Sequence, residues 1–485
     1  MIIVLTCALI ATALVGASYL TNPFNRFTIV KRPYIVEAAA NAFRAINENH
    51  RIVVRQGWLW RWFAIATCGI HILHTRYVRS PRSQAQSVEG IIADIHRLRF
   101  NPKKLLLISG DHFSALFVRN LGVFYYPMLD RAIPGSDADW HDRQTVYLQT
   151  VAYALGVFQK HSVPTTTIVS TGAYRATCVN FYAYPSDTVY GILYALAALL
   201  GKKPAAPAGY AKPQHRLGTR FATALLIKEY RTTLRRLYQH YRTTVFDDST
   251  GLIRTDIHLS GAKDITRRTS SFFDNVIFWK TTQLAMSLSI IRHDQGFLDE
   301  LKERIVGTFW LEDEGYFLED LSDDGRRDKY YSSDWLIVLA TGFLDPAHRR
   351  EQKYFTRSIA YTQKHQIDQP LPIKYQHETR AHRQFFAVRL AVASYGGDAI
   401  WSFWGMEYIK TLLLLHRATD KKSYLKTADE HIASYEKAML RDGGFPEVYD
   451  PNGKLLQTPL YRSIRQTGWV IGFEQVRAMR ASFEK

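Results

Sequence analysis

The sequence predicts an all-helical protein whose helices close into a toroid or stack into a solenoid. The chain has 485 residues, which exceeds the commonest size of a single domain but suits a ring of paired helices. From about residue 85 onward, apolar residues recur with the period of a helix. There is no βαβ pattern and no clear 34- or 40-residue repeat, which argues against a parallel α/β sheet and against the common helical repeats.

The predicted helices alternate with polar loops that contain turn-forming residues. Loops such as 133–136, 323–325 and 450–453 are built from Pro, Gly, Asp, Asn and Ser. The stretch 201–215, rich in Pro, Ala and Lys, is the most linker-like insertion, but we do not expect it to separate two domains. Helices are predicted over residues 85–99, 115–130, 143–160, 187–200, 217–241, 273–291, 295–306, 333–342, 347–364, 399–416, 421–439 and 463–480.

The first 22 residues are predicted to be a transmembrane anchor or a signal segment. Residues 2–20 carry no charge and are just long enough to span a bilayer. Residues 15–17 look like a small-residue cleavage site, but the basic residues follow the apolar run instead of preceding it (Arg26, Lys31 and Arg32). We therefore expect membrane association through this segment, and the two signals leave open on which side of the membrane the rest of the chain lies. Residues 23–84 would form an N-terminal extension, with a buried or interfacial element at 58–73, and residues 85–485 the barrel.

Charge and composition restrict the possible partners. A net charge of +18 would suit nucleic acid, an anionic membrane surface or an acidic glycan. The basic residues are spread along the chain and no nucleic-acid motif is present, so we expect no nucleic acid. The three cysteines form neither a disulfide framework nor a CxxC pair, and we expect no metal. Aromatic residues make up 13%, which a large core explains for the most part and a sugar-binding cleft in some part.

Two loops hold an acid in a setting that favours chemistry. Asp264 precedes a predicted helix and has basic neighbours (Lys263, Arg267 and Arg268). It is either an ion-paired acid near a helix start or a general acid, and a general acid would need burial that outweighs the nearby cations. Glu447 lies in the loop 441–453, whose Gly, Pro and Asp residues a simple turn explains. A turn does not explain a Glu between aromatic and apolar residues.

Two further loops combine an acid with basic or aromatic residues. The loop 109–122 contains Asp111, Phe113 and Arg119, and Asp111 would either cap a helix or hydrogen-bond to a sugar hydroxyl. The loop 395–407 contains Asp398 together with two tryptophans three positions apart, which share one face of a helix (Trp401 and Trp404). Core packing is the more common role of such a pair, and a wall on which a sugar stacks is the alternative.

In their order and spacing these loops resemble the six-hairpin glycosidases, closest to glycoside hydrolase family 63 and the trehalases. The general acid of those families is an Asp in a Ser-Gly-x-Asp or Ser-Gly-Trp-Asp segment, which is similar to residues 260–264 here with one residue added. Their general base is a Glu followed by an aromatic residue and Asp-Pro-x-Thr-Gly, and residues 447–453 match apart from the Thr. The separation of 447 − 264 = 183 residues is also similar. The resemblance covers about residues 100–480 and implies an (α/α)6 toroid with Asp264 as acid and Glu447 as base.

The resemblance also implies a set of substrate contacts. Residues 110–113 are similar to the family's Trp-Asp-x-x-Phe segment without its Trp, residues 397–401 to its Arg-Gly-Pro-Ile-Trp segment, and residues 468–469 to a late Gly-Trp. The implied activity is that of an inverting glycoside hydrolase on an α-linked glucoside or a related small glycoside, without metal or organic cofactor. The predicted substrate-binding residues are Asp111, Phe113, Arg119, Arg268, Asp274, Asp398, Trp401, Trp404 and Trp469.

Other functions on the same fold stay open. A glycoside phosphorylase would replace the base with a phosphate site, for which Arg267 and Arg268 are candidates. A polysaccharide lyase would need a Tyr, His or Lys base and an acidic substrate, which the positive charge favours. A non-catalytic carbohydrate-binding toroid is favoured by the added residue before Asp264, and an open helical-repeat scaffold would show a groove without convergent acids.

Overall fold

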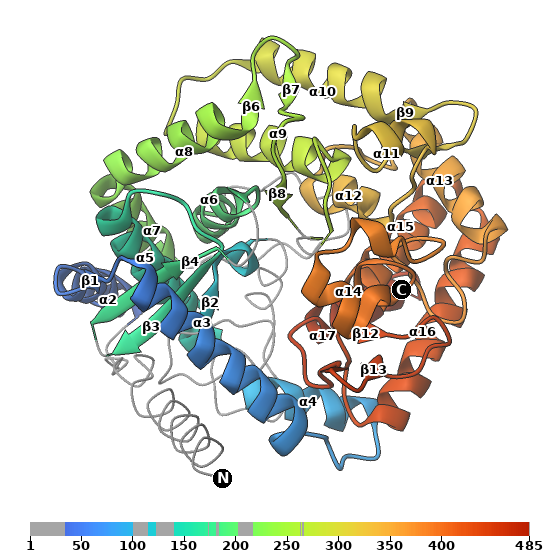
Figure 1. Ribbon diagram of the computed structural model, residues 1–485, viewed down its shortest axis with the longest axis horizontal. Helices are drawn as coiled ribbons and strands as arrows, with labels where there is room; N and C mark the ends of the chain where they lie inside the picture. The colour runs from blue at the N-terminus through green and yellow to red at the C-terminus, as the bar shows by residue number, and fades with distance from the viewer. Residues whose placement is uncertain are drawn as a thin grey trace.

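The computed structural model describes residues 34–99, 115–122, 140–172, 174–180, 184–201, 217–261, 263 and 266–484. Within these ranges the chain is mainly helical and its helices form a ring (Figure 1), so the predicted helical toroid is confirmed. The α-helices are α2 (Tyr34–Asn49), α3 (Trp58–Leu73), α4 (Val88–Arg99), α5 (Trp140–His161), α6 (Thr188–Leu199), α7 (Leu217–Glu229), α8 (Arg231–Val245), α9 (Phe272–Ser287), α10 (Gln295–Phe309), α11 (Asp323–Arg327), α12 (Ile337–Thr341), α13 (Gln352–Lys364), α14 (Phe386–Val392), α15 (Ser402–Thr419), α16 (Lys422–Asp442) and α17 (Val470–Ala481).

The helices of the ring fall into two kinds. α6, α9, α12 and α15 are buried along most of their length, and their sequences are correspondingly apolar; α6 contains no charged residue. α8, α10, α13 and α16 bury one face and carry charged residues on the other. α9 packs against α6, α10 and α12, and α15 against α13, α16 and α17. An inner layer of buried helices therefore lies against an outer layer of amphipathic helices.

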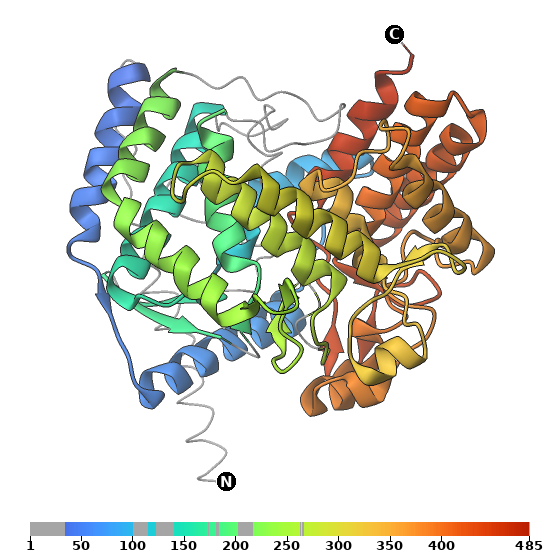
Figure 2. The same ribbon diagram turned by 90° about the horizontal axis from the view of Figure 1, so that it is seen from above.

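Short strand pairs hold the loops that lead into the buried helices. β6 (Phe246–Asp247) pairs with β7 (Leu252–Ile253) before α9, and β9 (Trp310–Leu311) pairs with β10 (Tyr316–Phe317) before α12. Other pairs join loops distant in sequence: β5 (Tyr184–Pro185) with β8 (Leu259–Ser260), and β11 (Ile400–Trp401) with β12 (Val448–Tyr449). A further pair, β13 (Gln457–Thr458) with β14 (Tyr461–Arg462), precedes α17. Apart from the β9–β10 pair, these loops lie toward one end of the ring, in the lower half of Figure 2, and we call it the loop end.

The N-terminal part of the chain contains a sheet that the sequence did not predict. β1 (Val53–Val54), β4 (Arg175–Val179), β3 (Thr167–Gly172) and β2 (Ala115–Phe117) pair in that order, parallel between β1 and β4 and antiparallel elsewhere. The helix predicted over 115–130 is therefore wrong for residues 115–122, which form β2 and the 3-10 turn Val118–Leu121. A short apolar run suits either element, and here pairing with β3 buries Ala115 and Leu116.

The residues that precede the barrel contribute two helices. α2 packs against α5 and α7, and α3 packs against β3 and β4. α3 occupies the stretch predicted to be buried or interfacial: it buries Ala64 and Cys68 and exposes Trp58 and Trp62. In the ranges that the structure describes, no helix is both long and apolar enough to cross a bilayer. The predicted anchor at 1–22 lies outside those ranges, and the domain boundaries at 22 and 84 stay predictions.

Candidate active site

The loop that carries Asp264 is anchored on both sides of that residue. Asp264 itself lies outside the described residues, as do Asp111 and Phe113. Before it, Arg119 Nη1 donates a hydrogen bond of 2.7 Å to the Gly261 carbonyl oxygen. After it, the Thr266 backbone N–H donates to the Lys263 carbonyl oxygen at 3.1 Å, and Thr266 pairs with Gln384 in an isolated β-bridge. The described residues on either side of Asp264 are thus held by two other loops, those of Arg119 and Gln384.

Gly261 is required by close packing against the start of α9. A Cβ atom at this position would lie 2.9 Å from Asp274 Oδ1 and 3.0 Å from Ser186 Oγ. Asp274 is held in place because its backbone N–H and its carboxylate both hydrogen-bond to the Ser271 hydroxyl, the N-cap of α9. Burial raises the pKa of Asp274, although the Arg268 guanidinium opposes that shift. The predicted residues Arg119 and Asp274 therefore lie on either side of the glycine that precedes Asp264.

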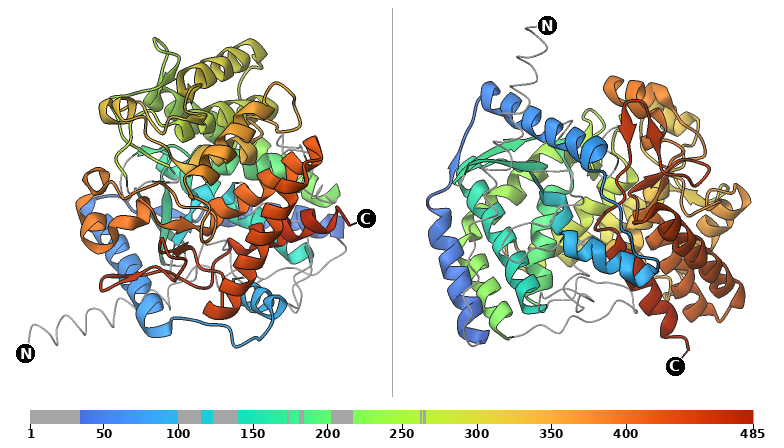
Figure 3. Two further views of the ribbon diagram at one scale, coloured as in Figure 1. Left: turned by 90° about the vertical axis from the view of Figure 1, so that its right-hand side faces the viewer. Right: turned by 90° about the horizontal axis from the view of Figure 1, so that it is seen from below.

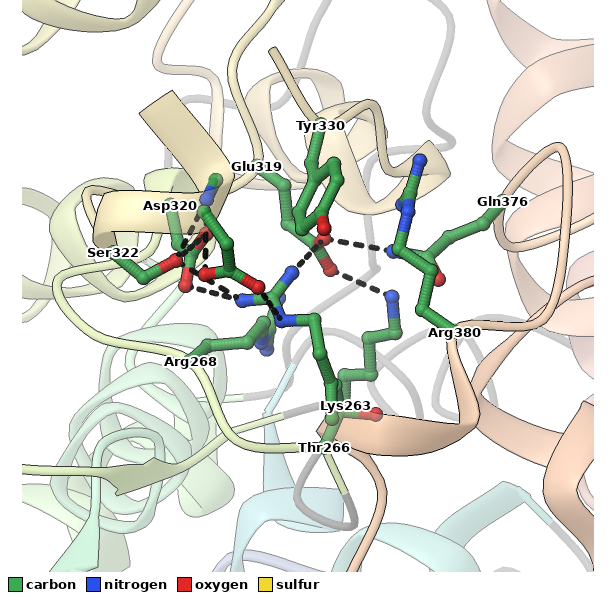
Figure 4. A network of polar contacts seen from close by, with 12 residues as sticks. Lys263, Thr266, Arg268, Glu319, Asp320, Ser322, Tyr330, Gln376 and Arg380 are labelled. Carbon is green, nitrogen blue, oxygen red and sulfur yellow. Dashed lines mark hydrogen bonds and ion pairs between the residues drawn. The ribbon is translucent and has the colours of Figure 1, made fainter. Parts of the chain in front are cut away.

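Six charged residues form a buried cluster beside this loop, three cations and three carboxylates. Glu319 accepts from Lys263 Nζ at 2.6 Å, from Arg383 Nη1 at 2.8 Å and from Gln376 Nε2 at 2.7 Å (Figure 4). Asp320 accepts from Arg383 Nη2 at 2.5 Å and from the backbone N–H of Thr269 at 3.0 Å. We call this set the charged cluster; its members are Lys263, Arg268, Glu319, Asp320, Asp334 and Arg383, none more than 4% exposed.

Each cation of the charged cluster pairs with a carboxylate of the cluster, and these pairs, together with burial, govern the pKa shifts of its members. Burial alone would raise the pKa of Glu319, but the Lys263 ammonium and the Arg383 guanidinium outweigh it and hold the pKa at about 2. Burial lowers the pKa of Lys263 to about 8, although the Glu319 carboxylate favours the ammonium. Glu319 is therefore ionised at every pH at which the protein would work, and it serves as a fixed counter-charge.

Arg268 has more hydrogen-bond donors than its ion-pair partner Asp334 accepts from. Its Nη1 donates to Asp334 Oδ2, and both side chains are almost fully buried. Within the described part of the chain, its buried Nε and Nη2 atoms have no hydrogen-bond partner. Because an unpaired buried donor is costly, these two nitrogen atoms call for an acceptor from outside the described residues. A substrate hydroxyl close to Arg268 would supply the missing acceptor.

Tyr375 connects the charged cluster to the tryptophans. Lys263 Nζ lies 4.6 Å from the centre of the Tyr375 ring. The Tyr375 ring in turn contacts Trp401 with 5.6 Å between ring centres and Trp404 with 6.5 Å, both edge to face. Trp404 also meets Phe273 of α9 at 6.3 Å. Trp404 is buried and serves the core, whereas Trp401 is half-buried.

Glu447 lies directly beside this aromatic group. Trp401 of β11 pairs with Val448 of β12, the residue after Glu447. The backbone of Glu447 is held from both sides: its N–H donates to the Ile464 carbonyl at 3.1 Å, and its carbonyl accepts from the Ser402 backbone N–H at 3.2 Å and hydroxyl at 3.0 Å. The Glu447 side chain is largely buried and lies close enough to Tyr461 to help raise the pKa of that phenol. A Glu in this loop is thus positioned by its backbone.

The two remaining predicted contacts lie at the edge of this arrangement. Trp469 is 8% exposed and packs on Phe403, whose ring meets Trp404. Asp398 follows α14, is half-buried and accepts a hydrogen bond of 2.6 Å from the hydroxyl of Thr379, which precedes α14. Trp469 therefore extends the aromatic group, whereas the contact of Asp398 joins the two segments that flank α14.

Sequence reasoning did not single out most of the charged cluster. Glu319, Asp320 and Asp334 lie in an acid-rich stretch whose other acids are mostly exposed, so composition alone does not separate them. One usable signal is that Glu319 and Asp320 directly follow three consecutive buried apolar residues, Tyr316–Leu318, which include strand β10. Asp256, another acid of the loop that precedes α9, is exposed and paired with Arg254. Among the described residues, no group of three or more His, Cys, Asp or Glu is placed to hold a metal ion.

Comparison with known proteins identifies the fold. No family model matches the chain, and no curated protein sequence matches it. Solved structures do: a glucoamylase from Saccharomycopsis fibuligera (TM-score 0.52, 10% identity, 84% of this chain and 98% of that one), a rhamnosidase from Klebsiella oxytoca with rhamnose bound (0.51, 12%, 83% and 66%) and a glucoamylase from Hormoconis resinae (0.51, 13%, 81% and 74%). This chain spans just under two thirds of the rhamnosidase. It has the six-hairpin glycosidase fold.

Proposed function

We propose that this protein is an inverting glycoside hydrolase that acts on an α-linked glucoside or a related small glycoside. The observation that carries the proposal is the series of contacts from Lys263 through Tyr375 and Trp401 to the strand that begins after Glu447. It brings the loop of the predicted acid and the loop of the predicted base to the same end of the ring, although 183 residues separate Asp264 from Glu447 (447 − 264).

In the proposed reaction, Asp264 donates a proton to the glycosidic oxygen, and Glu447 takes a proton from a water molecule that attacks the opposite face of the sugar. Inversion requires room for that water, which a separation of about 6.5–9.5 Å between the two carboxyl groups provides. Arg268 would donate to a sugar hydroxyl through the nitrogen atoms that have no partner within the described residues. Trp401 would offer its half-buried ring to an apolar sugar face.

The charged cluster supports a protonated acid in this loop. A general acid beside free cations would lose its proton, because nearby positive charge lowers the pKa of a carboxyl group. Here the two buried cations closest in sequence to Asp264 already have counter-charges: Lys263 pairs with Glu319, and Arg268 pairs with Asp334. Their effect on a neighbouring carboxyl group is therefore weaker than that of unpaired cations.

The test is turnover by the wild type and three variants on α-glucosides, trehalose and glucosylglycerate, with the product anomer followed by NMR. Glu447→Gln and Asp264→Asn are expected to lower turnover by about 10²–10⁴-fold, the usual worth of a general acid or base. Asp256→Asn is the matched control, since Asp256 is an exposed acid of the loop preceding α9 and forms an ion pair with Arg254. Full activity in Glu447→Gln would remove the base assignment.

Other outcomes of the same assay separate the remaining functions. Turnover that requires inorganic phosphate and yields a sugar phosphate would identify a phosphorylase. An unsaturated product from an acidic glycan would identify a lyase. Binding of a sugar without turnover of any substrate would identify a non-catalytic toroid, and the added residue before Asp264 would then be the first place to look.

We also propose that residues 1–22 associate the protein with a membrane. The support is the uncharged run 2–20. Extraction of membranes at alkaline pH should leave the full chain in the pellet and release a chain that lacks residues 2–22. Protease protection in sealed vesicles would then give the side on which the barrel lies.

A further inference from the structure

The surface of α3 carries exposed aromatic and apolar side chains that no element among the described residues covers. Trp58 is 69% exposed, Leu59 63% and Trp62 65%. The exposure continues past the end of α3 into the π-helical segment His74–Arg79, where Val78 is 72% exposed. We call this set the α3 face; its members are Trp58, Leu59, Trp62, Leu73, Tyr77 and Val78.

The α3 face is a rigid part of the molecule. The opposite side of the helix buries Ala64 and Cys68 in a small core with Val169 and Val179 of the sheet. Figure 3, right, shows α3 lying on the outside of that sheet. The residues after α3 are also fixed, because Arg465 Nη1 donates to the Ser80 hydroxyl at 3.0 Å and the Ser83 N–H donates to the Gly443 carbonyl at 2.8 Å. The exposed rings are therefore presented by a supported helix.

The charge around the α3 face has one sign. Residues 49–88 contain six arginines and no Asp or Glu. Arg61 and Arg79 are exposed beside the apolar residues, and the Arg55 guanidinium lies 3.6 Å from the centre of the Trp60 ring. Helices that lie in the interface of an anionic bilayer typically carry tryptophan and leucine on one face and arginine along its borders. The α3 face has this composition.

We infer that the α3 face inserts into the headgroup region of an anionic membrane, as a contact separate from residues 1–22. Charge complementarity favours this occupant over a second copy of the chain, which carries the same six arginines and would repel them. Because the residues after α3 are bound to the loop that contains Glu447, this contact would hold the loop end of the barrel close to the membrane surface. The inference stands whether or not the protein hydrolyses glycosides.

The experiment measures the immersion of single positions in the full chain. Spin labels are placed at Trp58→Cys, at Trp62→Cys and, as the matched control, at Glu300→Cys, which is exposed on α10 on the opposite side of the ring. Cys7 is replaced by Ser in all three, and Cys68 and Cys178 are buried. Each protein is reconstituted into nanodiscs of phosphatidylcholine with or without phosphatidylglycerol, and collisions of the label with oxygen and with a water-soluble nickel chelate are compared.

At positions 58 and 62 we expect oxygen accessibility to exceed nickel accessibility in anionic nanodiscs, and the reverse at position 300. Combining Arg61→Gln with Arg79→Gln should reduce the immersion. A chain tethered only by its N-terminus would leave all three labels equally open to nickel, which would overturn the inference. Shielding of positions 58 and 62 in a chain that lacks residues 2–22, in buffer without lipid or detergent, would also overturn it: shielding that grows with protein concentration would identify a second copy, and shielding independent of concentration would identify another part of the same chain.

Discussion

Glu319 and Glu447 lie at the same end of the ring and are both buried, but they are held in different ways. The Glu319 carboxylate contacts Lys263, Arg383 and Gln376, and these three residues come from two other loops. Glu447 is held through its backbone, which hydrogen-bonds to Ile464 and Ser402, and its side chain lies beside Tyr461. The first carboxylate joins loops together, whereas the second is carried by a loop that is already held.

This difference separates structural from chemical use of a carboxylate. A side chain whose burial is compensated by two cations, and whose pKa is held at about 2, cannot exchange protons near neutral pH. The backbone hydrogen bonds of Glu447 with Ile464 and Ser402, by contrast, do not depend on the identity of its side chain. Burial alone would have ranked Glu319 above Glu447 as a candidate general acid or base. The two cations that pair with Glu319 argue against that role for it.

The largest effect that the comparison predicts is on stability. Glu319→Gln should lower the free energy of unfolding by about 3–5 kcal/mol, because it leaves Lys263 buried without its counter-charge and removes one of the two buried carboxylates that pair with Arg383. Urea unfolding of this variant, of Glu447→Gln and of Glu300→Gln measures it, with exposed Glu300 as the control. Glu447→Gln keeps the backbone hydrogen bonds of its loop and should cost less than Glu319→Gln. If Glu447→Gln were as unstable as Glu319→Gln, the distinction between the two carboxylates would be lost.

The next effect concerns the glycine that precedes Asp264. Gly261→Ala should destabilise the protein by about 1–3 kcal/mol and lower activity, since its new Cβ would collide with Asp274, Phe273 and Ser186. Gly307→Ala on α10 is the matched control, because a Cβ there meets nothing within 4 Å. That change should stabilise the helix by up to about 1 kcal/mol. Thermal unfolding and turnover of both variants test the pair, and equal behaviour would contradict the tight packing at Gly261.

Local patterns predicted much of the fold. α6 and α9 lie within one or a few residues of the predicted 187–200 and 273–291, because a buried helix is marked by an apolar run and by loops with Gly, Pro and Asp at its ends. β2 was missed, since a run as short as 115–118 has no period that distinguishes strand from helix. Its partner β3 begins 50 residues later, which no local pattern records (167 − 117).

Site residues that stand in an unusual local sequence could be predicted. Site residues whose importance depends on an ion pair with a distant part of the chain could not. Glu447 and Gly261 stand in unusual local sequences, and the structure places both loops at the loop end. The pairs Lys263–Glu319 and Arg383–Glu319 join residues 56 and 64 positions apart, and both arise from the way the ring brings successive loops together. Charge balance of this kind depends on the closed fold, so the sequence showed the cations near Asp264 without showing what neutralises them.

The smallest predicted effect is the response of stability to acid. The pKa of Glu319 is held at about 2 in the folded protein against 4.5 ordinarily, so between those values the unfolded chain binds the extra proton and stability falls as the pH is lowered. Asp274 and Asp320, whose pKa values burial raises, act in the opposite direction, so the loss of stability should be smaller than Glu319 alone would cause. Urea unfolding at pH 5.5, 4.5 and 3.5 measures it. Glu319→Gln should lose less stability than the wild type over this interval, or even gain some, and an equal loss in both proteins would mean that Glu319 is not the group that titrates.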